Sequence, residues 1–482
     1  MNILVCFKVL PEPDRVLTED WEGFSQQTDL SYAGMDFSCF DGAALELGLQ
    51  LKEQMAEQGM VVTCSALTLG EALPESFSQR LYSIGYDRVL EIPVEGLEFA
   101  PEATAARLAA AAAEADLILT GREAGMGQTG MVPYLMAERL RMPLHGDVET
   151  ACFREQRLEI CCRKPRGLYK RECDLPALLT VGNSPAVLRA ATLRQQMKSR
   201  GRKPELFSPE PRPSAGWEGS FCPPPTKRAC QMLDPGKEDT FPFIRALIGK
   251  AEAPAAAGEQ NPVLAELQQA AALKKVFLFP DTEGGRLLAV RTAQEQGIRC
   301  CFGGQVTALS DRGLTIRQPV CGSNLTWVRE LPYPLVLTGD YEGPEQLRQE
   351  QLLEPEEETG LLSADVVLIC GNGMGSRAGC LEGRALAKQL GAGFGLTRPC
   401  AVNAWGSPAE IVGQSGKILA PGLCITLGAA GAGAFLAGIR KSRCILAVNT
   451  DPHALIFKGA DFGILMDAGE FLKRLKEEVE KP

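Results

Sequence analysis

The chain has 482 residues, a net charge of −10, and 45% apolar against 23% charged residues. This is an ordinary composition for a globular protein with a large core, and the length predicts about three domains. The acidic balance argues against sequence-independent nucleic-acid binding, which needs a basic surface. No apolar run approaches the length that crosses a bilayer, and the chain opens on a strand, so we expect a cytoplasmic protein without stable membrane insertion.

The cysteines and histidines indicate which metal sites and catalytic groups the chain could contain. The seventeen cysteines include vicinal pairs at Cys161-Cys162 and Cys300-Cys301 but no CxxC spacing. This pattern predicts reduced thiols that pack as small core residues, and no metal site. The two histidines, His145 and His453, do not lie in a motif that exposes a nucleophile, so we predict no catalytic side chain.

The first 200 residues alternate strands and helices. Residues 2–8 predict a strand, a polar loop runs to about residue 36, and a helix opens near Asp41, where a carboxylate suits the positive end of the helix dipole. An alanine-rich helix at 104–115 precedes a strand at 116–120. Alternation of this kind predicts βαβ units and a parallel sheet.

A glycine-rich loop, residues 121–130, follows that strand and precedes a helix at 132–140. Strand, loop and helix in this order predict a phosphate cradle, because small residues let backbone N–H groups approach an anion. The alternative is a structural turn that binds nothing.

The composition changes after residue 204. Prolines cluster up to about residue 225 and an alanine-rich run follows at 251–257, which predicts a linker or wrapping arm with one helical piece near 241–250. A strand at 274–280, a helix at 285–296 and runs at 317–325 and 333–338 then predict a further small α/β part.

The last 120 residues carry several small-residue loops next to short apolar runs. Residues 366–369 predict a strand that meets the turn Gly371-Asn372-Gly373, and a helix follows at 381–390. Further loops occupy 395–399, 412–417, 427–433 and 447–452. Stacked along one edge of a parallel sheet, these loops would form a groove for a dinucleotide.

These loops, in this order, resemble the FAD-binding domain of the electron-transfer flavoprotein alpha subunit. The matching motifs are Gly-x-Gly after a strand, Thr-Arg-Pro, Val-Gly-Gln-Ser-Gly-Lys, Gly-x-x-Gly-Ala, and Asn-x-Asp-Pro followed by Ala-Asp-Phe-Gly. Five ordered matches are far more specific than any single motif. The resemblance implies that FAD contacts the following residues: Thr397, Arg398, Val412, Gly413, Gln414, Ser415, Ala430, Gly431, Ala432, Gly433, Asn449 and Asp467.

The first 205 residues resemble the beta subunit of the same family, through Phe40-Asp41, Gly85-x-Asp87-Arg88 and the loop 121–130. There the loop wraps AMP or, in electron-bifurcating members, a second FAD, and the sequence leaves the two open. The resemblance implies the following contacts for this nucleotide: Cys6, Phe40, Asp41, Gly121, Gly127, Gln128, Thr129 and Gly130.

Residues 188–198 are similar to the beta-subunit loop that docks on a partner dehydrogenase. The resemblance makes Leu193 the anchor, with Arg194 next to it, since an apolar centre with a basic surround suits a transient docking surface. A solvated basic tail is the alternative. The basic surround would consist of Arg189, Arg194, Lys198, Arg200, Arg202 and Lys203.

Together these resemblances predict an α/β chain of Rossmann-like parallel-sheet domains in which a beta-like part precedes an abridged alpha-like part. The expected domains are a nucleotide-binding domain at 1–205, a linker or arm at 206–272, a short alpha-subunit domain I at 273–353 and a doubly wound FAD-binding domain at 355–482. The implied function is a fused electron carrier that takes electrons from a flavin dehydrogenase, of the acyl-CoA dehydrogenase type used in fatty acid beta-oxidation, and passes them to a downstream acceptor.

Three alternatives stay open. Phe435 and Ala430 stand where the family usually has His and Ser, which motivates a nucleotide-binding sensor or assembly partner with lost or altered redox function. A second FAD in the first half would make the protein electron-bifurcating. An NAD-dependent dehydrogenase would use Gly371-x-Gly373, but Ser376 stands at the position of the motif's final glycine.

Overall fold

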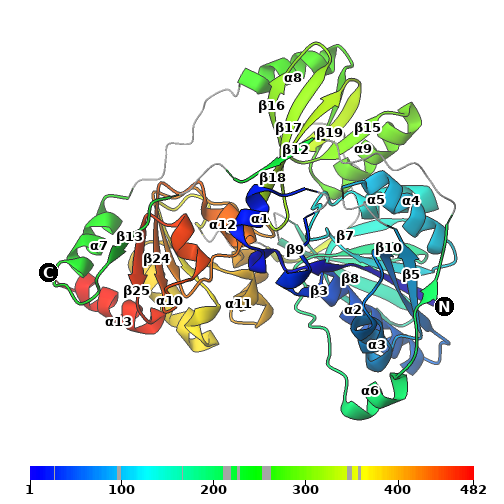
Figure 1. Cartoon of the computed structure of the whole chain (residues 1–482), viewed down its shortest axis with the longest axis horizontal. Helices are drawn as coiled ribbons and strands as arrows, with labels where there is room; N and C mark the ends of the chain where they lie inside the picture. The colour runs from blue at the N-terminus through cyan, green and yellow to red at the C-terminus, as the bar shows by residue number, and fades with distance from the viewer. Residues whose placement is uncertain are drawn as a thin grey trace. The chain divides into compact units, whose positions relative to one another are not determined.

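A computed structural model provides the structure of the chain (Figure 1). It describes residues 1–25, 28–94, 99–164, 167–209, 219–224, 228–251, 262–342, 344, 350–355 and 360–481. The chain divides into two compact units. Unit 1 combines residues 1–223 with 260–355, and unit 2 combines residues 224–259 with 356–482.

A ten-stranded sheet forms the centre of unit 1, in the order β11-β5-β4-β1-β6-β10-β7-β8-β9-β20. Neighbours from β11 to β7 are parallel, and those from β7 to β20 are antiparallel. The strands are β1 (Asn2–Phe7), β4 (Thr63–Gly70), β5 (Arg88–Pro93), β6 (Leu117–Gly121), β7 (Leu144–Arg154), β8 (Arg157–Lys164), β9 (Gly167–Cys173), β10 (Ala177–Val181), β11 (Glu205–Leu206) and β20 (Gln351–Pro355).

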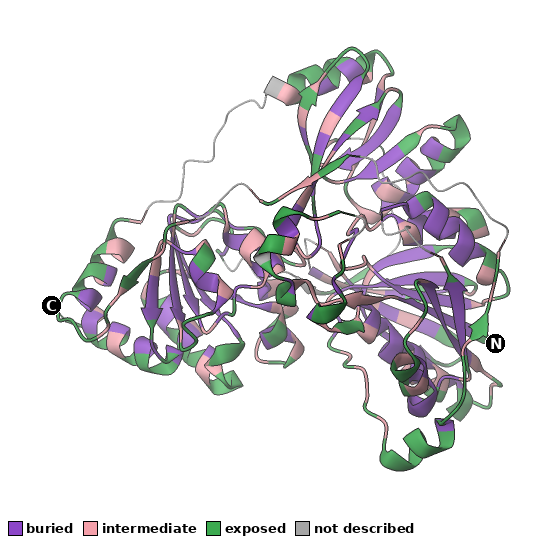
Figure 2. Cartoon of the chain, in the orientation of Figure 1, coloured by how far each residue is buried: buried purple, intermediate pink, exposed green. Residues whose placement is uncertain are grey.

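Helices cover both faces of this sheet, which explains why its central strands read as continuous apolar runs (Figures 1 and 2). One core lies under α2 and α3 and contains Val5 and Leu119, and the other lies under α4 and α5 and contains Leu4 and Ile118. The helices are α2 (Asp41–Glu57), α3 (Glu75–Ile84), α4 (Pro101–Ala111) and α5 (Val132–Leu140), and α6 (Leu193–Ser199) follows β10.

Two smaller sheets complete unit 1. A parallel sheet has the order β14-β19-β15, and an antiparallel sheet has the order β12-β18-β17-β16. Their elements are β12 (Ser220–Cys222), α8 (Pro262–Ala272), β14 (Val276–Pro280), α9 (Glu283–Gln296), β15 (Arg299–Phe302), β16 (Gln305–Leu309), β17 (Gly313–Val320), β18 (Leu325–Pro332) and β19 (Leu335–Gly339).

The segment predicted as a polar loop up to residue 36 is structured, so that prediction is wrong. It contains β2 (Val9–Pro11), α1 (Thr18–Glu22) and β3 (Met35–Phe37). Trp21 and Phe24 from this segment join Trp327 of β18 in one apolar cluster. Aromatic side chains from another part of the fold, among them Trp327, cover Trp21, and the sequence of the segment shows no apolar periodicity that would have predicted this.

A buried ionic network also joins the parts of unit 1. Arg171 on β9 binds Glu283, the first residue of α9, through Nη1 at 3.0 Å, and Glu350 through Nε at 2.9 Å. The Arg171 side chain is only 2% exposed. Glu283 also accepts the backbone N–H of Gly146 at 2.9 Å, so the carboxylate connects β7, β9 and α9.

Unit 2 is built on a six-stranded parallel sheet in the order β13-β25-β24-β23-β21-β22. Its strands are β13 (Gln231–Leu233), β21 (Val366–Cys370), β22 (Gly393–Leu396), β23 (Leu423–Leu427), β24 (Cys444–Asn449) and β25 (Phe462–Leu465). Its helices are α7 (Thr240–Gly249), α10 (Arg377–Gln389), α11 (Arg398–Val402), α12 (Gly433–Ile439) and α13 (Ala468–Val479).

The interval predicted as a linker contributes to both units. β12 and α8 belong to unit 1, whereas β13 extends the sheet of unit 2 and Phe241 of α7 packs against Phe471 of α13. Residues 210–218, 225–227 and 252–261 of that interval lie outside the described residues. The predicted α/β class with Rossmann-like parallel sheets is confirmed.

Candidate functional site

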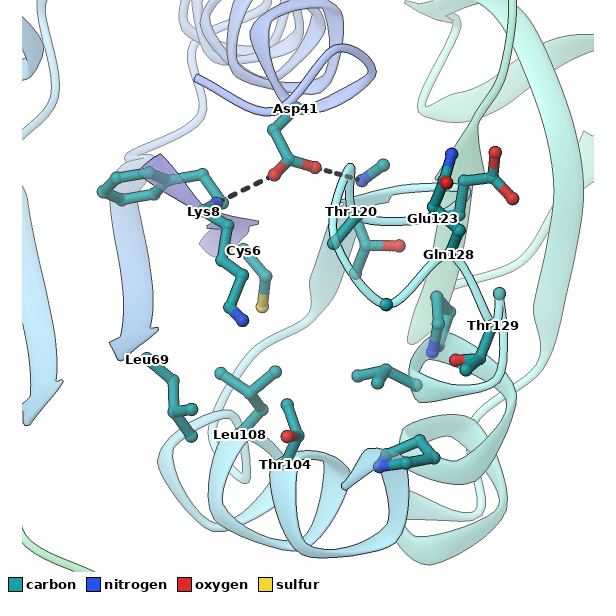
Figure 3. Close-up of a pocket in the computed structure, with 18 residues that line it drawn as sticks. Cys6, Lys8, Asp41, Leu69, Thr104, Leu108, Thr120, Glu123, Gln128 and Thr129 are labelled. Carbon is teal, nitrogen blue, oxygen red and sulfur yellow. Dashed lines mark hydrogen bonds between the residues drawn. The ribbon is translucent and has the colours of Figure 1, made fainter. Parts of the chain in front are cut away.

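A pocket in unit 1 opens at the carboxyl ends of β1, β4 and β6 (Figure 3). Its volume is about 740 Å³ when the open solvent at its mouth is included. Seven of the eight predicted nucleotide contacts line it: Cys6, Asp41, Gly121, Gly127, Gln128, Thr129 and Gly130. The eighth, Phe40, is fully buried under the guanidinium group of Arg122.

Asp41 lines this pocket and is hydrogen-bonded to the backbone of two neighbouring segments. Its carboxylate accepts the backbone N–H of Lys8 at 2.8 Å and that of Gly121 at 3.1 Å. These are the ends of β1 and β6, so one side chain at the start of α2 holds two strand ends together (Figure 3). Burial raises the pKa of Asp41 to about 7, although the two N–H bonds and the charge of Lys8 act in the opposite direction.

This raised pKa predicts a pH-dependent stability. The folded carboxyl titrates near 7 and the unfolded one near its usual 3.8, so between these values the folded state binds more protons. The contribution of Asp41 to the free energy of unfolding therefore falls as the pH rises from about 4 to about 7, by about 3–5 kcal/mol in total, and is constant above that.

The Asp41→Asn variant lacks this titration. Urea unfolding of both proteins between pH 4.5 and 8 should show the stability of the wild type declining relative to that of the variant. A constant difference across this range would contradict the prediction.

The loop 121–130 is held from two sides. Ser38 Oγ accepts the Gly125 N–H at 3.1 Å. On the other side, the turn between β17 and β18 bonds to the loop, since Cys321 N donates to the Met126 carbonyl at 2.8 Å and Gly322 N to Gln128 Oε1 at 2.9 Å. The Gln128 side chain is therefore engaged by the turn, and its predicted ligand contact would have to come from its other atoms.

Sequence reasoning missed several residues that line the pocket, among them Lys8, Thr104 and Thr120. The hydroxyl of Thr120 is buried and has no hydrogen-bond partner within the part of the chain that the structure describes. A buried hydroxyl in this state fits a site whose ligand supplies the partner. Thr104 lies within an alanine-rich helix, where the sequence carries no signal for binding.

The second site is the carboxyl edge of the sheet in unit 2. From β21 the chain passes to β22 on one side and then to β23, β24 and β25 on the other, so the strand order reverses at β21. Ligands of open α/β sheets bind at such a reversal. The loops after β21 and β23 meet here, because Gly373 N donates to the Gly428 carbonyl at 2.8 Å.

The structure brings most of the predicted FAD contacts to this edge. Val412 N donates to the Leu396 carbonyl at 2.9 Å, which puts the loop 412–415 beside Thr397 and Arg398. Asn449 Nδ2 donates to the Ala429 carbonyl at 2.8 Å, which puts Asn449 beside the turn 430–433. That turn carries no side chain larger than a methyl group, so a ligand could approach its backbone N–H groups closely.

Asp467 follows β25 at the same edge, but its carboxylate has a structural partner. It accepts the N–H groups of Gly469 at 2.9 Å and Glu470 at 3.0 Å and so caps α13. This is the ordinary role of an aspartate at the start of a helix.

The predicted docking residues lie on α6. Leu193 and Met197 are 73% and 70% exposed, and Arg194 is exposed beside them. Two basic residues expected in the surround are engaged elsewhere: Arg189 binds Glu46 at 2.8 Å, and the Arg202 guanidinium stacks 3.8 Å from the centroid of the Tyr82 ring.

Among the described residues, the helices are all too short or too polar to span a bilayer. The same residues include no cluster of three or more His, Cys, Asp or Glu side chains that could hold a metal ion.

The fold is an α/β fold in which both sites lie at the carboxyl ends of parallel strands, the usual position of ligand sites in open α/β sheets. Comparison with known families makes this more specific: residues 31–207 match the electron transfer flavoprotein domain, and residues 360–440 match the electron transfer flavoprotein FAD-binding domain. Two stretches of the chain thus match domains of the electron transfer flavoprotein family, one of them its FAD-binding domain.

Curated relatives agree with the second match. The mitochondrial alpha subunit from Oryza sativa subsp. indica is 44% identical over 124 residues, which cover 26% of this chain and 34% of the relative. The Bacillus subtilis alpha subunit is 36% identical over 133 residues, which cover 28% of this chain and 41% of the relative. Protein FixB of Rhizobium meliloti is 38% identical over 117 residues, which cover 24% of this chain and 33% of the relative. The matched stretch spans only about a third to two fifths of each relative's length.

Proposed function

We propose that this protein is an electron carrier in which a beta-like and an abridged alpha-like electron transfer flavoprotein part share one chain. It takes electrons from a flavin dehydrogenase, of the acyl-CoA dehydrogenase type, and delivers them to a downstream acceptor. The observation that carries the proposal is the edge of the sheet in unit 2, where the loops of the FAD-binding match meet at the reversal of strand order.

FAD, when bound, supplies the redox chemistry, since it can take up two electrons and release them singly. In this proposal Thr397 and Arg398 lie by its ring, and the fixed positive charge of Arg398 favours the reduced, anionic form. The loop 412–415 contacts the ring and the ribityl chain, the turn 430–433 receives the pyrophosphate, and Asn449 and the backbone near Asp467 border the adenosine half. The convergence of these loops at one edge supports the assignment.

The pocket of unit 1 is proposed to hold AMP or a second FAD. The glycine-rich loop that lines the pocket and the unpartnered Thr120 hydroxyl support a nucleotide there. The exposed apolar pair Leu193 and Met197, with Arg194 beside it, supports α6 as the surface that meets the dehydrogenase, because an apolar centre with charged neighbours suits transient docking.

The test is the nucleotide content of the anaerobically purified full chain, with FAD and AMP quantified after denaturation. One FAD and one AMP per chain would agree with a simple carrier. Two FAD would favour electron bifurcation. A chain that holds no FAD, even after incubation with an excess, would overturn the redox function and favour a sensor or assembly partner.

A pair of variants assigns each nucleotide to its unit. Thr120→Val removes the buried hydroxyl of a residue that lines the pocket. It should weaken binding of the nucleotide in unit 1 by about 5- to 10-fold and leave binding of the other nucleotide unchanged. The matched control is Thr426→Val, since Thr426 has an equally buried hydroxyl without a partner in the described residues but lies on β23 in unit 2. Equal losses in both variants would contradict the assignment.

A further inference from the structure

An ion pair in unit 2 lies directly before one of the loops of the proposed FAD site. Arg384 on α10 and Glu410 form a bidentate pair, in which Arg384 Nη2 lies 2.7 Å from Glu410 Oε2 and Arg384 Nη1 donates to Glu410 Oε1. Glu410 ends the short 3-10 helix η4 (Pro408–Glu410), and its side chain is only 5% exposed. A forked contact of this kind fixes the orientation of both groups as well as their distance.

The same carboxylate also holds the start of η4. Glu410 Oε2 accepts the backbone N–H of Ser407 at 3.0 Å, and Ser407 Oγ accepts that of Ala409 at 3.2 Å, as in a capping box. Gly406 lies against the pair, since a Cβ there would be 2.9 Å from Glu410 Oε2. The carboxylate is therefore enclosed by its own turn, with the Arg384 guanidinium as its cationic partner.

The chain pairs with β22 immediately after Glu410. Val412 N donates to the carbonyl of Leu396 at 2.9 Å, and Leu396 is the last residue of β22, directly before Thr397. The position of Glu410 therefore sets where the loop 412–415 begins relative to the segment that starts at Thr397. These are the two segments proposed to border the flavin ring.

Arg384 contacts β22 as well. Its guanidinium lies 4.5 Å from the centroid of the Phe394 ring, within the range of a cation–π interaction. Phe394 lies on β22, two residues before Leu396, and is buried. One side chain of α10 thus touches both elements that lead to the proposed ring site, namely β22 and η4. Because α10 itself packs on β21 and β22, this side chain projects from a rigid part of the unit.

We propose that Arg384 is a positioning residue of the FAD site. Through Glu410 and Phe394 it holds the loop 412–415 and the segment 397–398 in a fixed relation before the flavin binds. Segments that are already ordered lose less conformational entropy when a ligand binds, so their order raises the affinity. The inference rests on the proposed function and deepens it, since Arg384 is not among the predicted FAD contacts.

The competing explanation is that the pair only stabilises unit 2. The two explanations differ in the half of FAD that they affect. The segments 397–398 and 412–415 are assigned to the ring and the ribityl chain, whereas the turn 430–433 and Asn449 are assigned to the pyrophosphate and the adenosine half. ADP carries only this second half. A positioning role therefore weakens FAD and spares ADP, whereas a general loss of stability weakens both.

The test uses Arg384→Met in the full chain, because methionine has a long side chain but cannot pair with Glu410. FAD affinity is measured from flavin fluorescence, and ADP affinity from its competition with bound FAD. We expect the dissociation constant of FAD to rise about 10-fold and the inhibition constant of ADP to change by less than about 2-fold. Lys388→Met is the matched control, since Lys388 is an exposed cation on the same helix, and it should change neither constant.

Hydrogen exchange in the absence of FAD tests the loop directly. Peptides from residues 404–417 should exchange faster in Arg384→Met than in the wild type, whereas peptides from β23 and β24 should not change. This measurement needs no flavin. A wild type that binds no FAD, together with a loosened loop in the variant, would therefore overturn the proposed function but support the role of Arg384 in holding the loop.

Arg384→Lys serves if the methionine variant does not fold. Lysine keeps a positive charge beside Glu410 but loses the planar fork and its stacking on Phe394, so it should weaken FAD binding by about 3-fold and spare ADP. Equal proportional losses of FAD and ADP would overturn the proposal. Unchanged FAD affinity together with unchanged exchange of residues 404–417 would overturn it as well.

Discussion

Replacing Gly431 by alanine is expected to destabilise unit 2 by about 3–5 kcal/mol and to abolish FAD binding. Gly431 has φ +90°, a region that residues with a Cβ seldom occupy. A Cβ there would lie 2.0 Å from the backbone nitrogen of Ile456 and 2.6 Å from the carbonyl carbon of Leu455. Both are backbone atoms, so a side-chain rotation cannot relieve the overlap, and the turn after β23 would have to move.

Gly391→Ala is the matched control for this variant. Gly391 also has a positive φ, +64°, and lies in the same unit, but a Cβ there would meet no atom within 4 Å. The Gly391→Ala variant should lower the free energy of unfolding by only about 1–2 kcal/mol, because only the left-handed backbone conformation is strained there. Hydrogen exchange of peptides from β21 to β24, measured against urea concentration, compares the two variants. If Gly431→Ala were no worse than Gly391→Ala and kept its FAD, the close contact with Ile456 would be irrelevant.

The Arg171→Met variant should destabilise unit 1 by a similar amount, about 3–5 kcal/mol. Arg171 is 2% exposed, and its carboxylate partners Glu283 and Glu350 are 12% and 15% exposed. Methionine fills a comparable volume but leaves two largely buried carboxylates without this cation. The loss should appear as faster hydrogen exchange in β7 to β9 and in the first turn of α9, which the network joins.

An exposed pair on the same sheet provides the comparison. Arg157 and Glu172 pair across β8 and β9 with side chains 69% and 55% exposed, so Arg157→Met should cost less than about 1 kcal/mol. The double variant Arg171→Met with Glu283→Gln should recover part of the loss, because it removes one of the buried charges. Equal effects of Arg171→Met and Arg157→Met would show that burial does not decide the strength of this network.

The ordered motifs after residue 364 predicted the parallel α/β class and the loops at the carboxyl edge of the second sheet. These features could be predicted because both depend on local sequence. Apolar runs of strand length, with small-residue turns next to them, recur along the chain. The position of Asp41 near the start of a helix was predicted from local sequence, and its contact with a nucleotide was implied by the family resemblance. Its bonds to Lys8 and Gly121 could not be predicted, because they join residues 33 and 80 positions away.

The sequence by itself determined the alternation of strands and helices, the two glycine-rich loops and the resemblance that links them to a flavoprotein family. Only the tertiary structure decided that β2, α1 and β3 form between residues 9 and 37 and that the turn at 321–322 holds the loop at 121–130. The reason is physical: strand and turn propensities act over a few residues, whereas burial and hydrogen bonding of a side chain depend on partners brought close by the fold.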